Sequence, residues 1–378
     1  MEDSQKVLLI SVRAGAGHMR AAQAIEEALQ ERFPQVEVRN IEALAYTNAA
    51  YRRSFTGGYE RLSRDLPSVW GLIYAQLEKK PVDSKTKKLT QLFDRMNIRP
   101  ILKVIREFAP QRIVCTHYLP AEILAARRRK GKLGAWLSVV LTDYDIHTMW
   151  IQDGVNQYFV ATEEMEYALR AKGVGAAAVS VTGIPVMPAF ARSRDADKGA
   201  LRTRLGLRPD LPVVIAAASG FGAVKADETL AMLARAIAGV QFLAIAGRSA
   251  ELASQFERVA RSHPGTVMPY GFVENMHELM AAADFMVTKC GGLTSSECLA
   301  MGLPMVIVNP IPGQEERNAD FLLESGVALK ANSPAHLVFK VHMLLTDGGL
   351  LARMKRAALR VARPRAAYDI AEQVMSHA

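Results

Sequence analysis

Hydrophobic and polar positions follow a repeating pattern along the whole chain. Short apolar runs alternate with longer stretches in which apolar residues recur at helical spacing. Strands are predicted at residues 6–12, 36–41, 113–116, 136–141 and 157–160 in the first half, and at 212–217, 241–246, 266–268, 285–288 and 305–308 in the second. Helices are predicted between them, for example at 19–32 and 121–130. This alternation is typical of parallel sheets built from βαβ units and predicts the α/β class.

The pattern starts again near the middle of the chain, which predicts two domains. Each half opens with an apolar strand that runs into glycines, VLLISVRAGAGH in the first and VVIAAASGFG in the second. Pro185 and Pro188 interrupt regular structure between the halves, and a charged stretch continues to about Asp210. We therefore predict two Rossmann-like domains, residues 1–187 and 188–378, and allow for a last helix that packs back on the first domain.

The composition is that of a folded globular protein. Its 378 residues are 50% hydrophobic and 22% charged, which excludes a disordered, collagen-like or coiled-coil chain. The start lacks the basic and apolar regions of a signal peptide, and no apolar run approaches the roughly 20 residues that span a bilayer. Three cysteines without C-x-x-C spacing predict neither a disulfide framework nor a zinc site. We expect a cytoplasmic protein without a bound metal.

The positive charge is concentrated in one region. Residues 49–132 hold 19 basic and 7 acidic residues, whereas the formal net charge of the whole chain is +9. Aromatic residues are interleaved with the basic ones in residues 46–88, a segment that fits neither half of the repeating pattern. Such a region predicts an anionic partner, either a nucleic acid or an anionic membrane face. Solvated helix faces with buried aromatic residues would give the same pattern.

Two corners where a strand runs into glycines suit a phosphate or an oxyanion. At the first, Gly15 and Gly17 precede a helix, and His18 stands in its first turn. A helix N-terminus disfavours the charged imidazole, so a neutral His18 can take a proton from a hydroxyl group. The alternatives are a tight turn and an ordinary histidine. At the second corner, Ser219, Gly220 and Gly222 suit a phosphate but lack the Walker pattern, so the sequence gives no support for kinase or ATPase chemistry.

The densest chemistry lies between residues 270 and 318. A predicted strand runs into Gly291, Gly292 and Thr294, whose donors at a helix N-terminus suit a diphosphate, and Glu297 follows at a position that suits a ribose diol. Glu297 is alternatively an ordinary acid near a helix N-terminus. Gln314 and Glu315 follow the next strand, where ligands of open α/β sheets bind. Residues 277–281, HELMA, lack the second histidine of a zinc protease, which excludes that class.

These segments, in this order, resemble the monogalactosyldiacylglycerol synthase and processive diacylglycerol glucosyltransferase group. The group lies within the GT-B enzymes related to glycosyltransferase family 28 and to the peptidoglycan-precursor N-acetylglucosaminyltransferase. The resemblance covers nearly the whole chain. The matching segments are GAGH at 15–18, TDY at 142–144, VTGIPV at 181–186, GFVENMHELMAAAD, TKCGGLTSSECLAMGLPMVI and NPIPGQEERNA.

The resemblance implies a GT-B fold, in which two Rossmann-like domains face each other across a cleft. The first domain holds the acceptor and the second a UDP-sugar, with no obligatory metal or other cofactor. It also implies a base, His18 or Asp143, and contacts of the UDP-sugar with residues of the second domain. These are Phe272 and Val273 for uracil; Ser219, Gly220, Gly222, Gly291, Gly292 and Thr294 for the diphosphate; Glu297 for ribose; Gln314 and Glu315 for the sugar; and Arg248.

The expected reaction is an inverting hexosyl transfer from UDP-glucose or UDP-galactose to diacylglycerol or a glycosyl-diacylglycerol, which makes glycolipids. The basic region fits such a lipid acceptor, because lysine and arginine residues near an anionic bilayer each contribute about 1 kcal/mol and aromatic residues favour the interface. We expect a protein that is peripheral on the inner face of the cell membrane. The residues assigned to the acceptor and the membrane are Gly15, Gly17, Phe55, Trp70, Tyr74, Lys85, Lys87, Lys88, Arg127, Arg128, Arg129 and Lys130.

Three other functions compete with this interpretation. The same donor chemistry fits a polyprenyl-linked sugar or an aminolipid as acceptor, and a GT-B UDP-sugar epimerase needs no membrane acceptor. A nucleic-acid-binding protein would leave the GGLTSSE and GQE loops without a purpose, so we predict no nucleic-acid partner. The residues leave open the donor sugar, the exact lipid, processivity and the oligomeric state.

Overall fold

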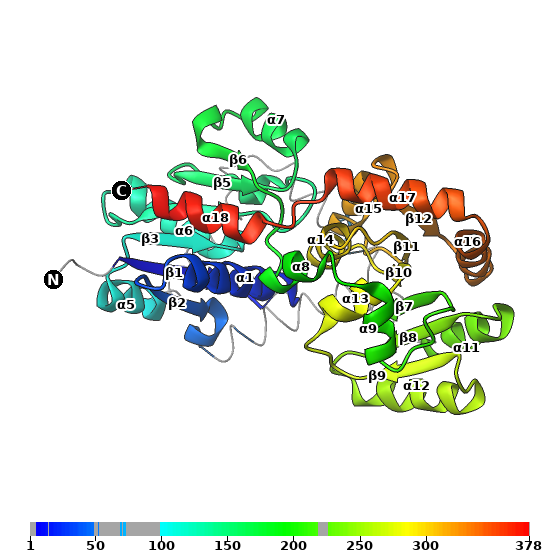
Figure 1. Cartoon of the computed structure of the whole chain (residues 1–378). Coiled ribbons are helices and arrows are strands. Elements are labelled where there is room, and N and C mark those ends of the chain that lie inside the picture. Colours follow the sequence, from blue (N-terminus) through cyan, green and yellow to red (C-terminus); the bar gives the residue numbers. More distant parts are fainter. Residues whose placement is uncertain are drawn as a thin grey trace. The chain divides into compact units, whose positions relative to one another are not determined.

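The computed structural model describes residues 5–13, 15–48, 52, 69, 71–72, 99–217 and 226–377. The chain forms two compact units, and Figure 1 labels their helices and strands. Unit 1 consists of Met1–Pro188, Ile311–Gln314 and Arg365–Ala378, and unit 2 of Ala189–Pro310 and Glu315–Pro364. Within the described ranges, no helix has the length and hydropathy of a bilayer span.

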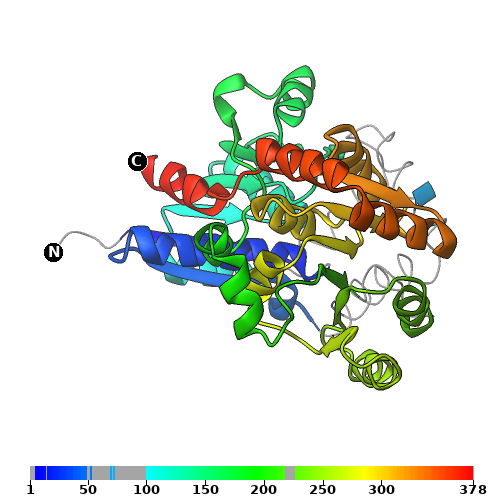
Figure 2. The same cartoon turned by 45° about the vertical axis from the view of Figure 1, so that its right-hand side comes forward.

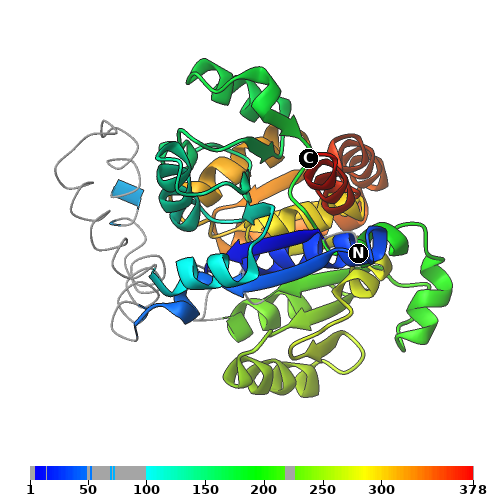
Figure 3. The same ribbon diagram turned by 90° about the vertical axis from the view of Figure 1, so that its left-hand side faces the viewer.

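Unit 1 is built on a six-stranded parallel sheet of order β2-β1-β3-β4-β5-β6. Figure 3 shows β1 and β2 side by side. The strands are β1 (Lys6–Ser11), β2 (Glu37–Glu42), β3 (Arg112–Cys115), β4 (Trp136–Val140), β5 (Gln157–Val160) and β6 (Val179–Val181). The helices are α1 (Gly17–Arg32), α5 (Arg99–Phe108), α6 (Tyr118–Arg129), α7 (Glu163–Ala171) and α18 (Ala366–Ser376).

The end of the chain belongs to unit 1. Helix α18 packs against α1, and Tyr368 donates a hydrogen bond of 2.6 Å to Glu31. The guanidinium group of Arg112 donates hydrogen bonds to the carbonyl oxygens of Met375 and His377, and the ring of His377 stacks on Trp136. The last helix is therefore an integral part of the unit.

Unit 2 has a second six-stranded parallel sheet, of order β12-β11-β10-β7-β8-β9. Its strands are β7 (Val213–Ala217), β8 (Gln241–Ile245), β9 (Val267–Tyr270), β10 (Phe285–Thr288), β11 (Met305–Val308) and β12 (Ala328–Ala331). Helices α11 (Ala226–Ala236), α12 (Ala250–Ser262) and α16 (Pro334–Thr346) pack on the face that Phe285 and Val287 share. On the opposite face, Met286 contacts Cys298 of α14 (Gly292–Ala300). The sheet is therefore covered by helices on both faces.

The remaining helices connect unit 1 to unit 2 or flank the second sheet. They are α8 (Pro188–Ser193), α9 (Lys198–Arg204), α13 (Met276–Ala282), α15 (Gln314–Glu324) and α17 (Gly348–Val361).

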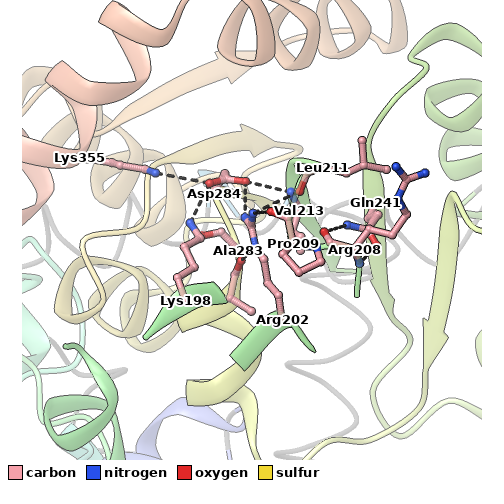
Figure 4. Close-up of polar contacts among 11 residues, drawn as sticks. Lys198, Arg202, Arg208, Pro209, Leu211, Val213, Gln241, Ala283, Asp284 and Lys355 are labelled. Atoms are coloured by element: carbon pink, nitrogen blue, oxygen red, sulfur yellow. Dashed lines mark hydrogen bonds and ion pairs between the residues drawn. The ribbon is translucent and has the colours of Figure 1, made fainter. Parts of the chain in front are cut away.

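A partly buried ion cluster holds α9 and α17 to the sheet of unit 2 (Figure 4). Its centre is Asp284, which lies just before β10 and accepts hydrogen bonds of 2.7 Å from both Lys198 and Arg202. Lys355 of α17 lies 3.6 Å from the same carboxylate, and the backbone N–H of Val213 donates to it at 2.9 Å. One carboxylate therefore joins two helices to the start of two strands.

Each sheet has one position where the strand order reverses. The reversal lies between β1 and β3 in unit 1 and between β7 and β10 in unit 2. Ligands of open parallel sheets bind outside the carboxyl ends of the strands at such a position. In the sequence, His18 follows β1, Ser219, Gly220 and Gly222 follow β7, and Gly291 follows β10.

The predicted α/β class is confirmed, and each of the ten predicted strands is present within two residues of its expected limits. Strands β6 and β12 were not predicted. Both are short edge strands with mixed burial, so their side chains do not show the continuous apolar run of a central strand.

Candidate active site

His18 in unit 1 is held by residues that follow the strands next to β1. Its Nδ1 atom lies 2.7 Å from the carbonyl oxygen of Thr116, after β3, and 2.9 Å from the hydroxyl oxygen of Thr142, after β4. Because a carbonyl oxygen can only accept, Nδ1 carries the proton and donates it to Thr116. The lone pair of a neutral His18 is then on Nε2, which can accept a proton from a hydroxyl group.

The electrostatic surroundings keep His18 neutral near pH 7. Burial lowers its pKa, although the negative charge of Asp143 and the hydrogen bond to Thr116 both act to raise it. The sequence predicted the lowered pKa from the helix N-terminus, and the structure attributes it to burial. Asp143 follows β4 and acts on His18 through its charge. The two residues proposed as the base are therefore coupled electrostatically.

A second buried histidine lies beside the first. The ring of His117 meets the ring of His18 edge to face, with 4.7 Å between centroids, and its Nδ1 accepts a hydrogen bond from the backbone N–H of Leu119. Burial and the nearby charge of His18 lower the pKa of His117 well below its ordinary value. Tyr118 and Trp150 lie against the same ring, with centroids 4.3 and 6.1 Å away. His18 thus stands in a largely aromatic environment.

The loop between β1 and α1 is fixed at its start and open at its end. The carboxylate of Glu42 accepts hydrogen bonds from the backbone N–H groups of Arg13, Leu44 and Ala45. Gly15 has φ +79°, a left-handed conformation that favours glycine, and a Cβ atom there would meet nothing within 4 Å. Among the residues that the structure describes, no side chain caps the N-terminus of α1. The backbone N–H groups of its first turn therefore suit an acceptor group.

In unit 2, the N-terminus of α14 has the features expected of a diphosphate site. Its N-cap residue is Gly291, no side chain in the described ranges caps the helix, and its first turn holds no acidic residue. A Cβ atom on Gly291 would lie 3.8 Å from the Oε1 atom of Glu315. Cys290 donates a hydrogen bond to the carbonyl oxygen of Glu315. The structure therefore brings Gly291, at the start of α14, close to Glu315, in the first turn of α15.

Glu297 lies on α14 and is 9% exposed. Ser296, its neighbour, donates a hydrogen bond of 2.8 Å to the carbonyl oxygen of Gly292. Such a buried carboxylate close to an uncapped helix N-terminus differs from a solvated acid that only balances the helix dipole. Its position suits a bound group with hydroxyl donors.

Arg248 and Phe272 also come together. The guanidinium carbon of Arg248, after β8, lies 3.8 Å from the ring centroid of Phe272, after β9. Phe272 is 51% exposed, a high value for a large apolar side chain. Val273 is its neighbour in the chain. The stacked pair offers a flat, positively charged surface that suits a nucleotide.

Some residues that the sequence assigned to the donor site or to the membrane lie apart from the residues described above or have other partners. Gln314 groups with unit 1, while Glu315 groups with unit 2. On α6, Arg129 pairs with Asp153 at 3.2 Å, and Arg128 donates to the carbonyl oxygen of Gly154. No cluster of metal-ligating side chains occurs in the part of the chain that the structure describes. The residues outside that part are Phe55, Trp70, Tyr74, Lys85, Lys87, Lys88, Ser219, Gly220 and Gly222.

The sequence analysis missed four residues around His18, namely Glu42, Thr116, His117 and Trp150. Glu42, Thr116 and His117 stand at or directly after the carboxyl ends of β2 and β3, the strands on either side of β1. A polar residue directly after a buried strand was the available signal. Without the strand order, nothing in the sequence placed these residues beside His18.

Comparisons with known proteins agree with the two-part organisation. The family described as monogalactosyldiacylglycerol (MGDG) synthase matches residues 18–186, and the glycosyltransferase family 28 C-terminal domain matches residues 222–374. The chain is 28% identical over 364 residues to a processive diacylglycerol beta-glucosyltransferase of Bacillus pumilus, which covers 94% of this chain and 91% of the relative. The predicted family resemblance is confirmed.

Solved structures confirm the predicted GT-B fold. MurG of Acinetobacter baumannii has a TM-score of 0.65 and 15% identity, covering 98% of this chain and 99% of its own. Anabaena Alr3699/HepE, crystallised in complex with UDP, has a TM-score of 0.57 and 16% identity, covering 98% of this chain and 100% of its own. At this identity the likeness concerns the fold alone.

Proposed function

We propose that the chain is a glycosyltransferase that joins an MGDG-synthase domain to a family 28 C-terminal domain, and that it transfers a hexose from a UDP-sugar to diacylglycerol or a glycosyl-diacylglycerol. The observation that carries the proposal is that each unit holds one candidate site, and that each site lies at the strand-order reversal of its sheet. Unit 1 presents a neutral imidazole whose lone pair is on Nε2, and unit 2 presents a helix N-terminus that no described side chain caps, close to buried Glu297. A proton acceptor and an anion site are the two elements that this reaction needs.

Unit 2 is the proposed donor site. Backbone N–H groups at Gly292 and Thr294 would bind the diphosphate, and Glu297 would accept hydrogen bonds from the ribose hydroxyls. Phe272 and Val273 would contact uracil, with Arg248 stacked on Phe272. When UDP leaves, these donors and the helix dipole stabilise the charge that develops on its phosphate oxygen. The sequence assigns Ser219, Gly220 and Gly222 to the same diphosphate.

Unit 1 is the proposed acceptor site, and His18 is the proposed base. Its Nε2 atom takes the proton from the lipid hydroxyl while the acceptor oxygen forms a bond to the anomeric carbon and the bond to UDP breaks. One such displacement inverts the anomeric centre. Asp143 is a positioning residue in this scheme, because its charge stabilises the imidazolium that forms. The product is a β-linked glycolipid if the donor is α-linked.

The test is transfer of radiolabel from UDP-glucose and, separately, from UDP-galactose into lipid extracted by organic solvent. The reaction contains the full chain and anionic vesicles with diacylglycerol, and Glu297→Ala serves as the donor-site control. Label in the lipid with one donor establishes the reaction and identifies the sugar. Release of UDP without labelled lipid would contradict the acceptor and point to a polyprenyl-linked sugar or an aminolipid. Conversion of one UDP-sugar into another without UDP release would point to an epimerase.

A further inference from the structure

Helix α17 of unit 2 carries a row of arginines that the proposed donor site does not use. Arg353, Arg356 and Arg360 are all exposed, and their spacing of three and four residues places them on one face of the helix. The row is about 10 Å long at 1.5 Å per residue. Residues 348–364 contain no acidic residue. We call these three residues the arginine row.

The opposite face of α17 holds the helix in place. Met354 and Ala358 are buried, and Met354 belongs to the apolar core of the unit. The helix packs against α14 and α16, and Figure 2 shows α16 and α17 next to each other. Lys355 points to Asp284 and is not part of the row. The arginine row is therefore presented by a rigid, well-anchored helix.

No acidic side chain among the described residues neutralises this row. Arg353, Arg356 and Arg360 form no ion pair with a described residue, whereas Arg202 of the ion cluster at Asp284 does. Like charges three and four residues apart destabilise a helix by a few tenths of a kcal/mol for each pair. The helix dipole favours Arg360 in the last turn but not Arg353 and Arg356, which lie outside that turn. An unneutralised row of this kind suits a surface of negative charge.

An exposed leucine distinguishes between the possible surfaces. Leu359 stands between Arg356 and Arg360, is 42% exposed, and lies against the turn at Gly302, where a Cβ atom would be 2.6 Å from its Cδ2. A nucleic-acid backbone makes no use of an apolar side chain among its phosphate contacts. At a bilayer, leucine lies among the acyl chains while arginine side chains reach the lipid phosphates.

We propose that the arginine row and Leu359 form a membrane-docking surface through which unit 2 binds anionic phospholipid headgroups. The basic segment that the sequence predicts at the membrane belongs to unit 1, and the surface proposed here would be a second one, on the donor unit. It rests on the proposed function only in the expectation that the enzyme works at a bilayer. The lipid is recognised by its negative headgroup charge, not by a particular headgroup.

The test compares two variants that lose the same charge from the same unit. One replaces Arg353, Arg356 and Arg360 with glutamine, and the control replaces Arg235, Arg258 and Arg261, exposed arginines of α11 and α12, with glutamine. Binding of the full chain is measured by sedimentation with vesicles of phosphatidylglycerol and phosphatidylcholine that contain no diacylglycerol. Vesicle binding is therefore tested whether or not sugar transfer occurs. Both variants are first checked for unchanged melting temperature and unchanged affinity for UDP.

Each arginine near the membrane contributes about fivefold to binding, and the row variant loses three of them. It should therefore bind anionic vesicles about 100-fold more weakly than the unmodified chain. The control should lose less than about threefold. Equal losses in both variants would overturn the proposal, because net charge alone would then explain binding. A greater loss of binding to a duplex oligonucleotide than to vesicles would also overturn it and assign the row to nucleic acid.

Discussion

At the scale of single residues, the tautomer of His18 decides what the proposed base can do. Its Nδ1–H group is committed to the carbonyl oxygen of Thr116, so Nε2 is the proton acceptor. We expect His18→Ala to lower kcat about 1,000-fold, the usual contribution of a general base, and to leave UDP affinity unchanged. Because burial lowers the pKa of His18, the kcat of the unmodified chain should fall on acidification with a midpoint below about pH 6.5, the ordinary value of an imidazole.

Steady-state rates and UDP titrations check this prediction, with His336→Ala as a matched control on an exposed surface of unit 2. A kcat within tenfold of the unmodified enzyme would remove His18 from the role of base. Asp143→Asn would then become the decisive variant.

His117, next to His18, predicts a pH dependence of stability. Burial lowers its pKa in the folded chain, so the unfolded chain takes up a proton near pH 6.5 that the folded chain does not. The free energy of unfolding therefore falls as the pH drops, by about 1.4 kcal/mol between pH 7.5 and 5.5 from this residue. His117→Asn keeps an acceptor for the N–H of Leu119, because asparagine is a good N-cap residue, but it cannot be protonated.

Urea unfolding of both chains at the two pH values measures this effect. The loss on acidification should be smaller in the variant by about 1.4 kcal/mol. An equal loss in both chains would show that His117 is protonated in the folded state.

At the scale of secondary-structure elements, Asp284 links α9 and α17 to the sheet of unit 2 through its ion pairs (Figure 4). Burial acts to raise its pKa, but Lys198, the N–H of Val213 and Arg202 hold it below its ordinary value. Burial lowers the pKa of Lys198, and the charges of Lys355 and Arg202 lower it further, although Asp284 acts to raise it. This carboxylate therefore stabilises the fold above about pH 3.8, and its contribution is lost as the pH falls through the lowered pKa.

Asp284→Ala should lower the free energy of unfolding by about 3–5 kcal/mol, because it leaves the buried guanidinium group of Arg202 without a countercharge. Asp284→Asn should lower it less, since the amide oxygen still accepts from Val213. The control is Arg208→Ala, which breaks an exposed pair with Asp210 and should have no measurable effect. Chemical denaturation checks the order of the three variants. A loss in Asp284→Ala as small as in the control would mean that the cluster is not essential to the fold.

At the scale of the whole molecule, the sequence predicted the features that depend on the spacing of hydrophobic residues and on short motifs. The buried central strands and the glycine corners were predictable because continuous apolar runs followed by glycine occur in few other contexts. Strand order was not predictable, since it depends on contacts between distant segments. This is why Thr116 and His117, which lie about 100 residues from His18 in the sequence, were missed, and why Gln314 and Glu315 were expected in the same unit.

The return of the chain to unit 1 predicts that its last helix stabilises that unit alone. Ile370 and Val374 are 0% exposed, and Tyr368 is 8% exposed. Removal of residues 365–378 therefore deletes these buried side chains and exposes the surface of α1 against which α18 packs. At about 1.5–3 kcal/mol for each large apolar side chain, unit 1 should lose at least about 5 kcal/mol. Unit 2 has its own core and should be unaffected.

Thermal unfolding with and without UDP separates the units, because UDP at 100 times its Kd adds about 2.7 kcal/mol to the unit that binds it. The truncated chain should lose the melting temperature of the UDP-insensitive transition and keep that of the UDP-sensitive one. Tyr368→Phe, which removes only the hydrogen bond to Glu31, should give a much smaller shift in the same transition. If truncation lowered both transitions equally, α18 would stabilise the two units together, and the assignment of this helix to unit 1 alone would be wrong.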